Sequence, residues 1–487
     1  MTSLPTRHWA GSVPAGERKL VIVLPANNPS VNLCKVVASA VALGYPAPVI
    51  VNWKEETDVQ TGDETRSHLT KITGVLEYLQ WATDSNTTKE ARLREDDLVL
   101  MLDAYDVWMQ LPPSVLIQRY FTANVQADQR LAMKSGSAFD DSSPHQTILV
   151  SSQKRCYAPR NSLSDLHCHE LPISPLPDDI FGFFTDSVFT KHEYARPRYL
   201  NSGSFMGPAG DMRRYFQRVS DRMNEHLAKT PSPDELSGDQ GIFAEIFGEQ
   251  EVARREAMTN HPADNLRSRQ TPDDSEFHLG LDYTQELFYP TCYSEHSGSF
   301  VQLSDSESIV HDSAQAGVAP PRLQSLPGDI ALSPSPFAML ENSPARNQEW
   351  ASVPLYADLW TSSIPVAIHH NAWRDGLKDR QQTWWDRTWY FPFLREMLDL
   401  RMSANTSSDS TEPIARIGAV ENNHTLTVWP YQAWDVPHAA LLFGASENGT
   451  LGLKGAKWSS VCQSRENEDE EQNPWYDEVF RDGKRSL

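Results

Sequence analysis

The feature that most constrains this chain is an apolar segment that runs directly into two carboxylates. Leu98 to Leu102 are all apolar, and Asp103-Ala104-Tyr105-Asp106 follows at once. An apolar segment without alternation is typical of a strand inside a parallel sheet that is covered on both faces. Ligands of such sheets bind beyond the carboxyl ends of the strands. The segment therefore predicts that two acids lie where a ligand binds.

The chemistry of these acids has two interpretations. Hard oxygen donors at a strand end suit Mg²⁺ or Mn²⁺, which bridges to the phosphates of a nucleotide. The local alternative is that Asp103 caps the following turn and Asp106 is solvated. The segment alone leaves both interpretations open.

Three later motifs favour the first interpretation. They are Tyr199 to Gly207 (YLNSGSFMG), Gly238-Asp239-Gln240 and Ile368-His369-His370-Asn371. In this order, and together with the Asp103 segment, they resemble GT-A glycosyltransferases, in particular the glycosyltransferase domain of procollagen lysyl hydroxylases and its relatives. The likeness covers roughly residues 18–400, without the hydroxylase domain of those enzymes. It implies an α/β fold of GT-A type, a Rossmann-like mixed sheet flanked by helices.

The resemblance also implies a metal site and a donor. Asp103 and Asp106 are expected to hold the metal together with a late histidine, for which His369 aligns best and His370 is the alternative. Two carboxylates and an imidazole favour Mn²⁺, with Mg²⁺ as the second choice. Tyr105 is expected to lie against the uracil of a UDP-sugar.

Further roles follow from the same resemblance and from positions at strand ends. The residues expected near the nucleotide are Asn27, Asn52, Trp53, Lys71, Asn371 and Lys378, and those expected near the transferred sugar or the reacting atoms are Asn201, Asp239 and Gln240. Lys71 and Lys378 have a solvated alternative, and Asp239 has a helix-capping one. Relatives often carry two adjacent acids where this chain has Gly238-Asp239, so a stereochemical outcome is not implied.

The expected function is therefore a metal-dependent transfer of a hexose from a UDP-sugar to a glycan or protein acceptor. Two other classes stay open. Asp103, Asp106 and His369 suit a metal-dependent phosphoester hydrolase, and a degenerate member of the family would bind nucleotide or glycan without turnover.

Composition narrows the partners. The chain has 43 basic and 65 acidic residues, a net charge of −22, which argues against a general nucleic-acid or anionic-membrane binder. No apolar run approaches the roughly 18 residues of a membrane span, and residues 1–17 lack the apolar core of a signal peptide. The compartment is left open between the secretory lumen of the resembling family and the cytosol.

The organisation expected along the chain has three parts. Residues 1–17 are a flexible N-terminus, and residues 18–400 form the glycosyltransferase domain with polar segments near 257–275 and 303–348 that are insertions or mobile surface loops. Residues 401–487 are a small β appendage with an acidic tail.

Cysteines and aromatic residues add two local expectations. Cys156 and Cys168 are candidates to bridge a loop, and the odd count of five cysteines leaves at least one thiol without a partner in the chain. The aromatic run from Thr383 to Leu400 predicts a packing helix that is kinked at Pro392.

Overall fold

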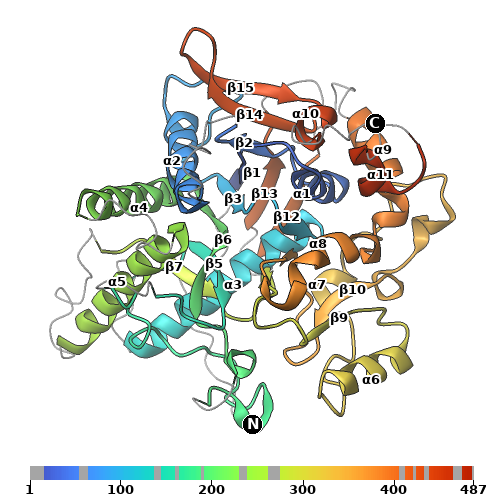
Figure 1. The fold of residues 1–487 in the computed structure, drawn as a ribbon, viewed down its shortest axis with the longest axis horizontal. Helices are drawn as coiled ribbons and strands as arrows, with labels where there is room; N and C mark the ends of the chain where they lie inside the picture. The colour runs from blue at the N-terminus through green and yellow to red at the C-terminus, as the bar shows by residue number, and fades with distance from the viewer. Residues whose placement is uncertain are drawn as a thin grey trace.

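A large mixed sheet forms the centre of the protein (Figure 1). The computed structural model describes residues 16–53, 64–135, 144–158, 164–187, 191–229, 238–260, 275–404, 412–419, 424–432, 438–463 and 474–484. Within them the strand order is β15-β14-β2-β1-β3-β6-β5-β7, with β13 beside β1 and β12 beside β13. Helices cover both faces, which confirms the expected α/β class with a mixed sheet.

The strands of this sheet come from both ends of the chain. They are β1 (Gly16–Pro25), β2 (Val49–Val51), β3 (Leu98–Leu102), β5 (Ile148–Gln153), β6 (Tyr199–Pro208), β7 (Leu279–Asp282), β12 (Ala415–Ala419), β13 (His424–Pro430), β14 (Ala440–Ala445) and β15 (Leu451–Ala456). Two small sheets stand beside it, one of β4 (Val107–Met109), β11 (Ala367–His369) and β8 (Phe288–Pro290), and one of β9 (Gly298–Val301) and β10 (Leu355–Asp358).

The longer helices form two layers. Those that cover the faces of the sheet are α1 (Val31–Ala42), α2 (Glu64–Thr83), α3 (Pro113–Ser135), α4 (Ala209–Lys229), α5 (Gly238–Asn260) and α9 (Leu394–Ala404). Shorter helices are α6 (Ser306–Gln315), α7 (Gly328–Ala331), α8 (Arg380–Thr383), α10 (Trp458–Cys462) and α11 (Trp475–Phe480). Figure 1 shows α2, α4 and α5 together on one side, and α1, α9 and α11 on the other.

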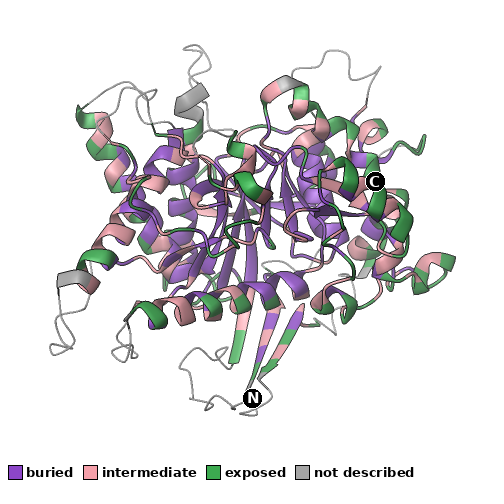
Figure 2. Cartoon of the chain, turned by 90° about the horizontal axis from the view of Figure 1, so that it is seen from below, coloured by how far each residue is buried: buried purple, intermediate pink, exposed green. Residues whose placement is uncertain are grey.

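Strand alternation divides the interior into two cores. On β1, Leu20, Ile22 and Leu24 pack with α1, whereas Val21 and Val23 pack with α2, α4 and α5. Successive side chains of a strand point to opposite faces, so a strand that is covered on both sides must be apolar throughout. Figure 2 shows buried strands in the centre of the molecule, with helices of mixed burial around them.

The strand before the two acids follows this rule. All of β3 is buried, as its composition predicts. It pairs parallel with β1 but antiparallel with β6, with Leu102 opposite Ser204. The neighbourhood of β3 is therefore mixed and not wholly parallel.

The C-terminal strands complete this sheet and do not form the separate β appendage that we expected. The strand β2 is short and pairs only with the last residues of β1, Val23–Pro25. On this side of β1, the first half of the strand is therefore not paired with β2. β13 pairs with this half in parallel register, with Gly16 opposite Leu426, and β14 pairs with β2. Covering an exposed strand edge removes unpaired backbone groups, which explains why the C-terminal strands return to the sheet.

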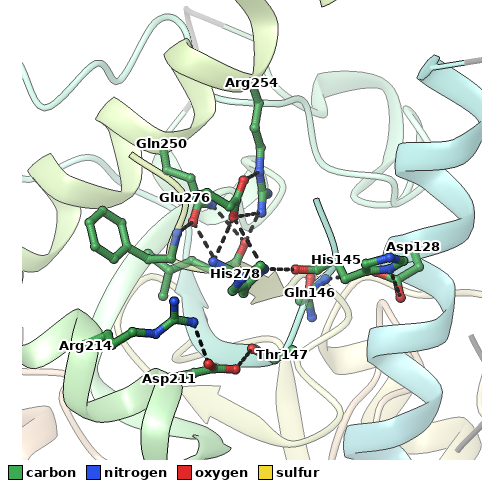
Figure 3. A network of polar contacts seen from close by, with 12 residues as sticks. Asp128, His145, Gln146, Thr147, Asp211, Arg214, Gln250, Arg254, Glu276 and His278 are labelled. Atoms are coloured by element: carbon green, nitrogen blue, oxygen red, sulfur yellow. Dashed lines mark hydrogen bonds and ion pairs between the residues drawn. The ribbon is translucent and has the colours of Figure 1, made fainter. Parts of the chain in front are cut away.

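The opposite edge of the sheet is covered by a side chain of α5. Gln250 Oε1 accepts hydrogen bonds from the backbone N–H groups of Phe277 and Leu279, and Gln250 Nε2 donates to the Leu279 carbonyl. Beside it, Arg254 forms an ion pair with Glu276 at 2.6 Å in the buried network of Figure 3. This pairing protects the end strand β7 from association with another edge.

Residues 303–348 are an ordered part of the fold, so the mobile-loop alternative does not apply to them. This segment contains α6 and α7. Its residues Ile309, Ile330 and Phe337 are buried in the hydrophobic core to which α1 also belongs. A few apolar residues within a polar, proline-rich segment are enough to fix it to the core. Most of the other expected insertion, residues 261–274, lies outside the described residues.

Two disulfides are present. The predicted Cys156–Cys168 bond is confirmed, and a second bond that we did not predict joins Cys34 of α1 to Cys462 of α10. Cys292 is a buried free thiol. None of the described helices is both long and apolar enough to cross a membrane.

The two disulfides close loops of very different length, with sequence separations of 428 and 12 residues. Under oxidising conditions we expect Cys34→Ala/Cys462→Ala to lower the free energy of unfolding about twice as much as Cys156→Ala/Cys168→Ala, because chain entropy favours the longer loop. Urea denaturation of both double variants measures this. An equal loss of unfolding free energy in the two double variants would contradict the prediction that the Cys34–Cys462 bond stabilises the protein more.

Candidate metal centre

The two acids of the first motif stand at the junction of two sheets. Asp103 follows β3, and its backbone N–H donates to the Gly203 carbonyl at 2.8 Å. Asp106 precedes β4, the strand that leaves the central sheet for the small one. The turn between them therefore holds both carboxylates at the carboxyl end of β3.

Strand pairing brings the late histidine to the same place. β11 pairs antiparallel with β4, with His369 opposite Val107, and the His370 N–H donates to the Asp106 carbonyl at 2.7 Å. His369 Nε2 then lies 3.3 Å from Asp106 Oδ1 and 3.5 Å from Asp103 Oδ2. The three residues predicted as metal ligands therefore form one cluster.

A buried amide fixes the orientation of the histidine ring. Asn201 Oδ1 lies 3.2 Å from His369 Nδ1 and also accepts from the Gly203 N–H, while Asn201 Nδ2 donates to Gln153 Oε1. An acceptor at Nδ1 places the ring proton there and leaves the lone pair on Nε2, which faces the acids. Such a hydrogen bond to the second ring nitrogen is typical of metal-binding histidines.

The cluster fits a divalent cation. His369 Nε2 is buried and makes no hydrogen bond within the described residues, an expensive state for a polar atom in the absence of a ligand. Its separations from the two carboxylate oxygens are close to the spacing of about 3 Å expected between neighbouring ligands of one octahedral ion. Two carboxylates with one imidazole suit Mn²⁺ better than Mg²⁺.

Two lysines compensate the charge of the acids. Lys71 of α2 places its Nζ 2.7 Å from Asp103 Oδ1 and 2.8 Å from Asp239 Oδ2, and Lys378 Nζ lies 2.6 Å from Asp106 Oδ2. Burial lowers the pKa of Lys71, but the two carboxylates outweigh burial and hold it above its usual value. Burial likewise opposes ionisation of Asp106, but the neighbouring charges, that of Lys378 among them, hold its pKa well below the ordinary range. Both groups are therefore charged at neutral pH.

The lysines take the outer oxygens of the acids. Lys71 bonds to Oδ1 of Asp103 and Lys378 to Oδ2 of Asp106, whereas the other two oxygens face His369. The lysines therefore neutralise the acids and leave the position between the three ligands accessible to a cation.

Gly203 makes this close arrangement sterically feasible. A Cβ added to it would lie 2.2 Å from His369 Cε1 and 2.9 Å from Asp103 Oδ2. Any side chain at this position would therefore displace two of the three ligands. Gly203 thus allows the close approach of the candidate metal ligands.

His370, the alternative ligand, does not belong to the cluster. Its ring lies 4.0 Å from the ring of Trp108, and burial lowers the pKa of His370 to about 3. Neighbouring residues at the end of a strand point to opposite faces, so His369 and His370 cannot both face the acids. The choice of His369 is supported by this geometry.

Of the residues expected near the nucleotide, some lie together beside the acids and others contact different parts of the protein. Tyr105 donates from its hydroxyl to Asn27 Oδ1 at 2.9 Å, so these two expected residues lie together beside the acids. Asn52 has a left-handed backbone with φ 64° and donates from Nδ2 to the Thr70 carbonyl, which directs its amide towards α2. Asn371 Oδ1 accepts from the Cys292 N–H, and Trp53 is half-buried against the core of α1.

The side chains expected to act on the sugar form hydrogen bonds or ion pairs with other groups of the protein. Asn201 orients His369, as described. Gln240 Oε1 accepts from the Ser202 N–H, and its Nε2 donates to the Leu200 carbonyl. Asp239, at the start of α5, reaches the centre through Lys71. These contacts favour positioning roles for Asn201 and Gln240.

Sequence reasoning missed two residues that support the centre. Gln153 holds the amide of Asn201, and Thr291 donates to the His369 carbonyl from its N–H at 2.9 Å and its hydroxyl at 3.1 Å. Neither lies in a recognisable motif. Gln153 is the last residue of β5, and the apolar segment Ile148 to Val150 before it is the only signal that the sequence offers for it.

Comparisons with known proteins do not identify the chain. No family model matches the sequence, and no curated protein matches it.

Substitution of Gly203 tests the geometry of the centre. We expect Gly203→Ala to weaken Mn²⁺ binding at least about tenfold, because the new methyl group occupies the space of His369 and Asp103. Calorimetric titration with MnCl₂ measures the affinity. Gly444→Ala is the matched control, since a Cβ there meets nothing within 4 Å. Unchanged Mn²⁺ affinity in Gly203→Ala would contradict the assigned ligand set.

Proposed function

We propose that this protein is a metal-dependent glycosyltransferase of GT-A type that transfers a hexose from a UDP-sugar to a glycan or protein acceptor. The observation that carries the proposal is the cluster of Asp103, Asp106 and His369 at the carboxyl end of β3, with the unpaired His369 Nε2 directed at the two acids. Its position agrees with the place where ligands of open α/β sheets bind.

The metal, when bound, neutralises the charge that develops on the β-phosphate of the leaving UDP. The protein supports this with its own cations. The Lys378 side chain is half-exposed beside Asp106, so its ammonium is accessible to a diphosphate. Lys71 is buried between Asp103 and Asp239 and fixes the two carboxylates relative to each other. Lys378 is therefore assigned to the phosphates and Lys71 to positioning.

The nucleotide base is assigned to the face of the half-buried Tyr105 ring. The Tyr105 hydroxyl is held by Asn27 and by the backbone of Asn28, which fixes the ring between the first strand and the two acids. A ring held in this way offers a preorganised face to uracil. Asn27 thus supports Tyr105 and lies at the edge of the base.

Asp239 is assigned to the sugar side of the centre. Burial raises the pKa of Asp239, but the charge of Lys71 outweighs burial and keeps that pKa below its ordinary value. The group is therefore an ionised acceptor and not a proton donor. An ionised carboxylate here accepts hydrogen bonds from sugar hydroxyls and holds Lys71 in place.

Loss of a metal ligand tests the proposed activity. We expect MnCl₂ with UDP to raise the melting temperature of the parent protein, because ligands that bind the native state stabilise it, and we expect no such rise in Asp106→Asn. Asp165→Asn is the control, because Asp165 belongs to an exposed acidic and histidine group outside this site. A thermal-shift series with and without MnCl₂ measures the effect.

The same series separates the competing functions. Stabilisation by UDP and UDP-hexoses that needs MnCl₂, followed by UDP release during incubation, supports transfer. Metal-dependent binding without release supports a degenerate binding protein, and hydrolysis of 4-nitrophenyl phosphate without a UDP response supports a phosphoesterase. Either of the last two results would overturn the proposal.

A second test concerns the base. Tyr105→Ala should weaken UDP binding by about 1–3 kcal/mol, the contribution of an aromatic face to a stacked base. Tyr105→Phe keeps the ring and loses only the hydroxyl contacts with Asn27 and Asn28, so it should retain most of the affinity. Calorimetry with UDP and MnCl₂ compares the two variants. Equal affinities in Tyr105→Ala and the parent would show that uracil binds elsewhere.

A further inference from the structure

A cleft of about 550 Å³ opens among four loops on the side of the His369 strand. One of these loops follows β5, and a second contains residues 191–193. The other two follow β8 and β11. Its lining residues include Arg155, Lys191, Glu193, Tyr293, Trp373 and Arg374. None of them belongs to the metal cluster, so the cleft is a separate feature.

The cleft adjoins the metal centre. Arg374 follows the ligand His369 by five residues, so the two backbones are at most about 18 Å apart. Two further bonds tie the loop after β8 to the same segment: Thr291 N–H donates to the His369 carbonyl, and Cys292 N–H donates to Asn371 Oδ1, both at 2.9 Å. The segments that carry Tyr293 and Arg374 into the cleft are therefore bonded directly to the segment that carries His369.

Two arginines converge on one aromatic ring in the cleft. Arg155 Nη1 donates to the Tyr293 hydroxyl at 2.6 Å, and the Arg374 guanidinium lies 4.2 Å from the centre of the Tyr293 ring. The His192 ring lies 5.0 Å from the same ring. Burial and the charges of Arg155 and Arg374 lower the pKa of His192.

The arginines retain capacity for a ligand. Arg374 pairs with Glu295 at 3.1 Å, but 32% of its side-chain surface remains exposed. Lys191 is exposed at the rim. In a chain with a net charge of −22, a group of three cations around one cleft is a local attraction for anions.

The other lining residues suit a hydroxylated ring. Trp373 is 64% exposed and offers an open aromatic face beside Arg374. Glu193 lines the same cleft, and its carboxylate accepts hydrogen bonds from hydroxyl groups but repels a second anionic group. An acidic peptide with several carboxylates fits this mixture less well than a sugar with a single charge.

We propose that this cleft binds the acceptor and that the acceptor is a saccharide with one anionic group, a carboxylate or a phosphate. Arg155, Arg374 and Lys191 bind the anion, Trp373 packs against the sugar ring, and Glu193 accepts from its hydroxyls. This assignment of the acceptor rests on the proposed transferase function. It gives the reaction a specificity for charged over neutral sugars.

The test uses the full chain in EDTA without nucleotide, so that it is independent of the metal centre. Saturation-transfer NMR compares glucuronic acid, glucose 6-phosphate, glucose and inorganic phosphate as ligands. We expect at least one of the two charged sugars to bind about tenfold tighter than glucose, since a charge-assisted hydrogen bond contributes that much. The tighter of the two identifies the anionic group as carboxylate or phosphate.

Variants locate the binding. Arg155→Gln/Lys191→Gln should weaken binding of the charged sugar about tenfold. Lys89→Gln/Lys134→Gln should leave it unchanged, because these two exposed lysines lie outside the cleft and their loss changes the net charge by the same amount. Trp373→Ala should weaken both charged and neutral sugars. Melting temperatures verify that all variants are folded.

Three results would overturn the inference. They are equal binding of charged and neutral sugars, an equal loss in the two double variants, and inorganic phosphate binding as tightly as glucose 6-phosphate, which would indicate a simple anion site. Each of these leaves Mn²⁺-dependent UDP binding by the parent protein unaffected. A failure of the proposed function would instead show as absent UDP binding with MnCl₂ present.

Discussion

The antiparallel pairing of β4 with β11 holds the candidate site together. Asp103 and Asp106 are fixed by the end of β3, but His369 comes from a distant part of the chain and is brought beside them by this pairing. The register that sets His369 opposite Val107 also gives the His370 N–H its acceptor on Asp106. Because β11 pairs with β8 on its other side, the same small sheet carries the loop of Tyr293 to the cleft.

Charge compensation is the second constraint on the site. Three acids, Asp103, Asp106 and Asp239, lie close together. Ionised carboxylates at such short range repel one another unless cations separate them. Lys71 lies between Asp103 and Asp239, and Lys378 caps Asp106. Removing a buried partner from such a network leaves an uncompensated charge, which destabilises a protein more than the pair itself stabilises it. The fold and the site therefore depend on the same ion pairs.

The local part of this arrangement could be predicted from the sequence. An apolar strand that ends in Asp103 and Asp106 is a short-range pattern, and the strand before His369 is another. The resemblance then linked the two, since no periodicity indicates that β4 and β11 pair. Lys71 was expected near the nucleotide, but its side chain contacts the acids. The position of a residue on a helix does not show where its side chain points until the packing of α2 on the sheet is known.

The long-range part could not be predicted. Residues 415–456 read as strands but carried no signal for their partners, and only the free half of β1 explains why they join the main sheet. The aromatic run after residue 383 was expected to be one kinked helix. It breaks into the short 3₁₀ turns Trp385–Arg387 and Phe391–Phe393 before α9, and Trp385, Trp389 and Tyr390 are buried in the core.

Anomalous diffraction at the manganese edge, from crystals grown with MnCl₂ and UDP, examines the proposed site most directly. The account predicts one anomalous peak bonded to Asp103, Asp106 and His369 Nε2, with the UDP phosphates on the same ion and uracil against Tyr105. A peak at another place, or UDP bound away from these residues, would contradict it.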